Sequence, residues 1–142
     1  MNPYHLAYRR TQAQSLPATR IELLLALYDK AVERITAAED ALHAGDRPRA
    51  LPLTAKAQLI VMELAAGVRT DVDPATGTNM LRLYEFVTYK LAEGGIDNLQ
   101  SALRVLTTLR EGFRAIRDEA VELEKTGKIP ASDELVMLAA EA

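Results

Sequence analysis

The side chains best suited to chemistry in this sequence are two histidines, His5 and His43, and a few clustered carboxylates. His43 follows Asp40 by three residues, the spacing at which a helix presents a metal-binding pair. A dinuclear centre in a helical bundle needs a second such pair and further carboxylates, and the sequence offers none to face this one. We therefore expect no metal and no other cofactor.

His43 also raises an alternative, in which it is the phosphorylated residue of a helical phosphotransfer or regulatory bundle. Such a histidine normally lies in the middle of a helix on an exposed face. His43 instead falls at the end of the first expected helix, where a histidine interacts favourably with the helix dipole. At this point the alternative stays open.

The segment from Asp71 to Arg82 resembles a calcium-binding loop only superficially. Asp71 and Asp73 match the first and third positions, but Thr76 replaces the glycine required at the sixth and Arg82 the glutamate required at the twelfth. The sequence also lacks cysteine and a glycine-rich phosphate loop, and no Ser-His-Asp set can be assembled without straining the helices. We expect a protein without catalytic activity.

The composition indicates a single helical domain. The 142 residues are 49% hydrophobic but only 5% aromatic, so the core must consist of Leu, Ala, Ile and Val, a mixture that favours helices. A net charge of −3 argues against nucleic-acid binding. The longest apolar run, Leu23 to Tyr28, is too short to enter a membrane, and no signal peptide is evident, so we expect a cytoplasmic protein.

Capping signals and apolar spacing predict the first two long helices. Thr19 and Glu22 form a capping box that starts the first helix, which ends at Gly45. Asp46 caps the second helix, which extends to about residue 69. Pro52 predicts a kink in that helix, or else a later start near residue 51.

Two more long helices follow, with a short one after them. The third begins at Asp73 or at Asn79 and ends at the glycine pair 94–95. The fourth is capped by Asp97 and continues to residue 126. Ser132 caps a short terminal helix that ends at residue 138. The expected fold is all-α, an antiparallel up-down four-helix bundle (20–126) between an N-terminal arm (1–19) and a C-terminal tail (127–142) with a short helix.

Apolar residues exceed what the seams of such a bundle require. Leu23 and Leu27 lie beside the core-facing stripe of the first helix, and Leu59 and Met62 flank that of the second. The third helix carries Leu81 and Phe86 in the same way. These residues either widen the core or line a groove for a partner helix. A third possibility is that the bundle self-associates through them.

Short motifs along residues 2–117 resemble the flagellar secretion chaperone family FliS. The motifs occur in the family's order. They are Asn2-Pro3-Tyr4 with Ala7-Tyr8, Ala18-Thr19 with Glu22-Leu23 and Leu27-Tyr28-Asp29, Lys56-Ala57-Gln58 with Ile60, Glu63 and Leu64, then Asn79, Leu83-Tyr84 and Leu91, and finally Leu106, Leu109-Arg110-Glu111 and Phe113.

The resemblance implies a cytoplasmic export chaperone with flagellin and the flagellar export apparatus as partners. The disordered C-terminal segment of flagellin would fold into short helices along hydrophobic grooves, which prevents premature polymerisation and keeps flagellin competent for export. Tyr4 and Tyr8 would anchor the arm over part of the groove or pin it to the bundle. The residues expected to line or support the groove are Leu23, Leu24, Leu27, Tyr28, Ile60, Leu64, Tyr84 and Val87.

Overall fold

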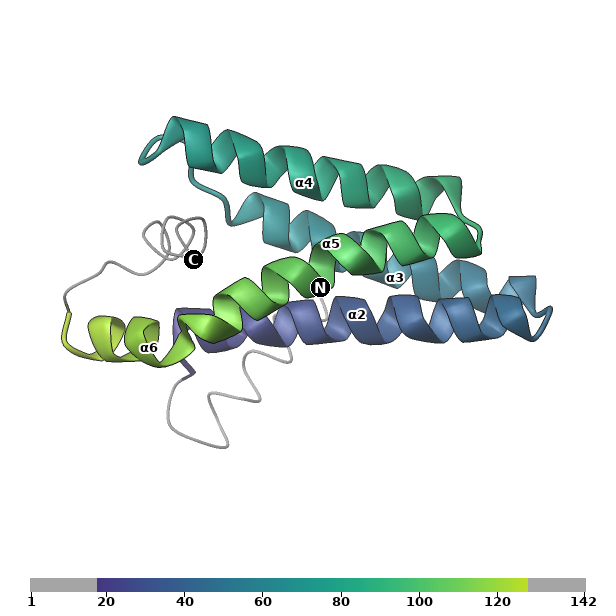
Figure 1. Cartoon of the computed structure of the whole chain (residues 1–142), viewed down its shortest axis with the longest axis horizontal. Helices are drawn as coiled ribbons and strands as arrows, with labels where there is room; N and C mark the ends of the chain where they lie inside the picture. Colours follow the sequence, from purple (N-terminus) through teal and green to yellow (C-terminus); the bar gives the residue numbers. More distant parts are fainter. Residues whose placement is uncertain (1–17, 128–142) are drawn as a thin grey trace.

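The computed structural model describes residues 18–127, and every regular element in that range is a helix (Figure 1). Four long helices run antiparallel, with α2 and α4 each packed against both α3 and α5. A short helix, α6, follows α5 and packs against α2. The expected all-α bundle is confirmed. The helices are α2 (Arg20–His43), α3 (Arg47–Ala66), α4 (Pro74–Glu93), α5 (Ile96–Ala115) and α6 (Arg117–Lys125).

The predicted capping box starts α2. The backbone N–H of Thr19 donates to Glu22 Oε1 at 3.2 Å, and the Thr19 hydroxyl donates to the same oxygen at 2.7 Å. These two bonds, with a smaller contribution from Arg117, lower the pKa of Glu22. At the other end, Gly45 takes a φ of 75°, which reverses the chain and lets Asp46 donate its N–H to the Ala41 carbonyl.

Helix α3 begins where Asp46 predicts and continues through Pro52. The Asp46 carboxylate accepts the Arg49 N–H at 3.2 Å, and α3 begins at Arg47, so a start near residue 51 is wrong. Pro52 lies in the second turn, where its missing N–H leaves only the Pro48 carbonyl without a helical donor. The predicted kink itself stays a prediction.

Helix α4 begins at the earlier of the two expected positions. Asp73 caps it through the Thr76 N–H at 3.3 Å and the Thr76 hydroxyl at 2.6 Å, so the start at Asn79 is wrong. The first turn packs tightly on the preceding loop, because a Cβ at Gly77 would lie 2.9 Å from the Arg69 carbonyl oxygen. Gly77 is therefore required by close packing at this turn.

The fourth predicted helix is two helices in the structure. Gly95, at a φ of 86°, precedes α5, so Asp97 lies in the first turn and is not the cap. The chain leaves α-helical geometry at Ile116 and resumes as α6 at Arg117. The break lets Arg117 reach Glu22 at 3.3 Å on α2, a contact between helix ends that no spacing pattern encodes.

The predicted arm falls on residues that are described only from Ala18 onward, and the terminal helix predicted from Ser132 lies outside the described residues altogether.

Candidate partner-binding surface

Two tyrosines meet at the centre of the bundle. The hydroxyls of Tyr28 on α2 and Tyr84 on α4 lie 2.6 Å apart, and the Tyr28 ring packs on Phe113 of α5 with 5.5 Å between ring centres. Burial raises the pKa of Tyr84 to about 12 and raises the pKa of Tyr28 even further. Both hydroxyls are therefore neutral at physiological pH, and each satisfies the other across the core.

Five of the expected groove residues belong to this core. Tyr28, Ile60 and Val87 are fully buried, and Leu64 and Tyr84 are 3% exposed. In this conformation they are positioned to support a surface from beneath and do not line it.

The remaining expected residues of α2 lie nearer to solvent. Leu23, Leu24 and Leu27 are half-buried, and Leu24 and Leu27 pack against the core while Leu23 does not. Leu27 precedes Asp29 by two residues, which places it about 160° around the helix axis from Asp29. Since Asp29 pairs with Arg110 of α5 at 3.2 Å, Leu23 and Leu27 lie on the flank of α2 that faces away from α5.

The outward face of α3 is apolar along most of the helix. Leu51, Leu59 and Met62 are 61%, 54% and 59% exposed, and Ala55 and Ala66 are exposed between and beyond them. The intervals of four, four, three and four residues place all five on one side of the helix. Since α3 also buries apolar residues against the core, it is hydrophobic around most of its circumference, a property of helices that are covered on all sides.

Helix α4 also exposes an aromatic residue, near the level of Gln58 on α3. The Gln58 amide donates to the Thr88 carbonyl at 3.5 Å, which sets α3 and α4 level at these residues. Tyr89 follows Thr88 and is 65% exposed, and Leu59, which follows Gln58 on α3, is 54% exposed. We call this surface the α3–α4 face; its residues are Leu51, Ala55, Leu59, Met62, Ala66 and Tyr89.

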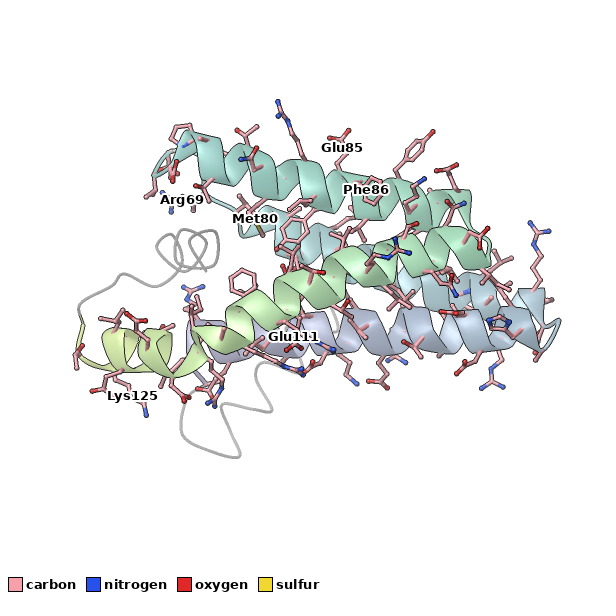
Figure 2. The ribbon with its side chains drawn as sticks, viewed as in Figure 1. Arg69, Met80, Glu85, Phe86, Glu111 and Lys125 are labelled. Carbon is pink, nitrogen blue, oxygen red and sulfur yellow. The ribbon has the colours of Figure 1, made fainter. Side chains whose placement is uncertain are left out.

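A smaller apolar patch lies on the other flank of α4. Leu83 and Phe86 are 37% and 41% exposed, and the Lys90 ammonium lies 5.5 Å from the centre of the Phe86 ring. Figure 2 shows Glu85 directed away from the bundle and Phe86 on the side of α4 toward α5. The sequence pattern identified Leu59, Met62 and Phe86 as surplus apolar residues but not Leu51 or Tyr89, whose only signal was their place on outer helix faces.

The described residues considered above for metal binding or phosphotransfer lie on the surface of the bundle. Asp71 pairs with Arg69 at 2.6 Å, which lowers its pKa to about 2. His43 is exposed at the end of α2, with Glu39 Oε1 at 3.4 Å. Within residues 18–127, no three His, Asp or Glu side chains are grouped closely enough to hold a metal ion. None of the helices described here is both long and apolar enough to cross a membrane.

Comparison with known families gives a match over most of the chain. The family model described as flagellar protein FliS covers residues 1–120. The chain belongs to the FliS family. Members of this family are flagellar export chaperones, so the phosphotransfer alternative through His43 receives no support. A search of curated proteins found no match.

The FliS match takes in α2 to α5 and the first part of α6, and thus the apolar residues of α2, the α3–α4 face and the patch at Leu83 and Phe86. It also takes in Tyr4 and Tyr8, which lie outside the described residues. The segment after residue 120, including the apolar run at 135–138, is not part of the match.

Proposed function

We propose that this protein is a cytoplasmic chaperone that binds the disordered C-terminal segment of flagellin and keeps it unpolymerised and competent for export. The observation that carries the proposal is the exposed apolar face of α3, with the half-buried Leu23 and Leu27 on the α2 side of it, in a member of an export chaperone family. A segment without stable structure of its own needs such a surface to fold against, because only apolar burial can offset its ordering cost.

The two apolar surfaces suit a partner that wraps around α3. Leu23 and Leu27 lie on the α2 side of α3, and the α3–α4 face covers its outer and α4 sides. Between them stand Lys56 and Glu63, seven residues apart along α3. Flagellin would lay one amphipathic helix on each surface, and the tyrosine pair Tyr28–Tyr84 with Ile60, Leu64 and Val87 would hold the underlying helices in place. Leu24 supports Leu23 and Leu27 from the core side. Tyr4 and Tyr8 remain proposed anchors for the arm.

Substitution with aspartate tests each surface separately. Met62→Asp is expected to leave the helical content unchanged and to weaken binding of a flagellin C-terminal peptide by about tenfold or more, because burying a carboxylate opposes the gain from burying a Met side chain. Leu27→Asp should abolish binding. Leu27 packs on the core, so Leu23→Asp, which alters no core residue, is the second variant for the α2 side.

Thr108→Asp on the exposed side of α5 is the matched control, and it should bind as the parent chain does. Unchanged affinity in Met62→Asp would remove the α3–α4 face from the site. Unchanged affinity in both Leu23→Asp and Leu27→Asp would remove the first helix from it.

A further inference from the structure

One flank of α2 combines an apolar pair with positive charges at both ends. Arg20, Leu23, Leu27, Lys30 and Arg34 recur at intervals of three and four residues, which places them on one side of the helix. Arg20 and Lys30 are exposed, and the two leucines and Arg34 are half-buried. We call these five residues the α2 flank.

The end of α6 brings the C-terminal tail to the start of this flank. The Arg20 backbone N–H donates to Glu124 Oε2 at 2.9 Å, so the last turn of α6 lies against the first turn of α2. Gly127 then takes a φ of 70°, which turns the chain away from the α6 axis. The described chain therefore ends three residues after the Glu124 contact with Arg20, and Arg20 lies about one helical turn before Leu23.

The tail has the complementary pattern. Ser132 predicts the start of a helix that ends at residue 138; Glu134, Leu135 and Leu138 lie within it, and Glu141 follows three residues after its end. The pattern is acidic, apolar and acidic, whereas that of the α2 flank is basic, apolar and basic. A tail that runs parallel to α2 would place Glu134 near Arg20 and Glu141 near Lys30.

The lengths agree with this arrangement. From Glu134 to Leu138 a helix would span about 6 Å, and residues 139–141 would add up to about 10 Å when extended, while Arg20 to Lys30 spans about 15 Å along α2. The four residues 128–131 can bridge up to about 14 Å when extended. A linker this short gives the tail an effective concentration in the millimolar range, so that even weak apolar contact is populated.

We propose that residues 132–141 dock on the α2 flank of the same molecule and cover Leu23 and Leu27. The regulatory consequence rests on the proposed function: flagellin must displace the tail before it can use the α2 side of its site. The tail then acts as an intramolecular competitor that shields the apolar pair in the free chaperone.

Distance measurement between two spin labels tests the docking without flagellin. The chain has no cysteine, so Ala26→Cys on α2 and Met137→Cys in the tail can be labelled specifically in the full chain. The expected result is a narrow distribution centred below about 25 Å, given helices packed 8–10 Å apart and flexible labels. The matched control, Thr108→Cys with Met137→Cys, should give a longer distance because Thr108 lies on the exposed side of α5.

Charge reversal separates docking on the flank from other causes of a short distance. Glu141→Lys should broaden the Ala26–Met137 distribution, and adding Lys30→Glu should restore it. The proposal would be overturned if the Ala26–Met137 distance distribution of the parent chain were as broad as that of a Leu135→Asp/Leu138→Asp variant carrying the same labels. So would a short distance in a mixture of singly labelled chains, which would assign the contact to a second copy.

Peptide binding then measures the competition. If the tail covers the flank 80–90% of the time, removal of residues 128–142 should raise the affinity for a flagellin C-terminal peptide about five- to tenfold. Unchanged affinity with a narrow label distance would refute competition but leave the docking intact. No binding by either chain, with a narrow distance in the full chain, would count against the proposed function alone.

Discussion

At the scale of single residues, the buried tyrosine pair is the most informative contact. Both tyrosines are buried, and each hydroxyl has the other as its hydrogen-bond partner at 2.6 Å. Tyr28→Phe should destabilise the fold by about 1–3 kcal/mol, because it leaves the Tyr84 hydroxyl buried without a partner. The double variant Tyr28→Phe/Tyr84→Phe should cost less than the sum of the two single variants, as measured by urea unfolding.

Additive losses in that cycle would contradict the pairing. Tyr28→Phe keeps the ring that packs on Phe113, so its effect reports on the hydroxyl and not on a cavity.

The capping carboxylate predicts a specific pH dependence. The folded-state pKa of Glu22 lies below its ordinary value of 4.5, mainly through the Thr19 hydrogen bonds. A group with a lowered folded pKa contributes stability above its unfolded pKa and loses that contribution as the pH falls through the folded value. Glu22→Gln should therefore be less stable than the parent at pH 7, and the difference should shrink below about pH 4.5. A difference in free energy of unfolding that is constant from pH 7 to pH 3 would contradict this account.

At the scale of helices, two glycines in helical turns predict opposite effects of alanine. A Cβ at Gly77 would lie 2.9 Å from the Arg69 carbonyl oxygen and 3.1 Å from Thr70, whereas a Cβ at Gly112 would meet nothing within 4 Å. Gly77→Ala should destabilise the protein by about 1–3 kcal/mol through this clash. Gly112→Ala should stabilise it by up to about 1 kcal/mol, since alanine is the better helix former. Thermal unfolding of the two variants measures both, and a stabilised Gly77→Ala chain would show that the turn relaxes freely.

Local signals predicted the helices well because their causes are local. The caps at Thr19, Asp46 and Asp73 each satisfy backbone donors within three residues, so spacing alone identifies them. The break at Ile116 could not be found in this way, because the apolar pattern continues across it. The break accompanies contacts of α6 with α2, which join residues about a hundred positions apart.

The candidate site was less predictable for a related reason. Apolar spacing gives the direction of a helix face but not whether another helix covers it. Tyr84 and Tyr89 are both aromatic residues of α4, yet one is 3% exposed and the other 65%. The difference in exposure between the two tyrosines depends on the positions of α3 and α5, and the sequence of α4 does not encode those positions.

At the scale of the whole molecule, the bundle separates stability from recognition. Interior positions of all four long helices build the core around Tyr28, while α3 supplies apolar residues to both the core and the outer surface. Aspartate at an outer position such as Met62 should therefore change binding with little change in stability. Aspartate at Ile60, two residues away and fully buried, should instead unfold the bundle, as seen by circular dichroism.

The central claim is that apolar burial by a partner segment drives binding, and calorimetric titration tests it most directly. The full chain would be titrated with a peptide of roughly the last forty residues of flagellin at several temperatures. Coupled folding on an apolar surface predicts a one-to-one complex, a gain in helicity and a heat-capacity change of about −0.2 to −0.5 kcal/mol/K. The absence of binding by the folded chain, and by variants that lack residues 1–17 or 128–142, would contradict the account.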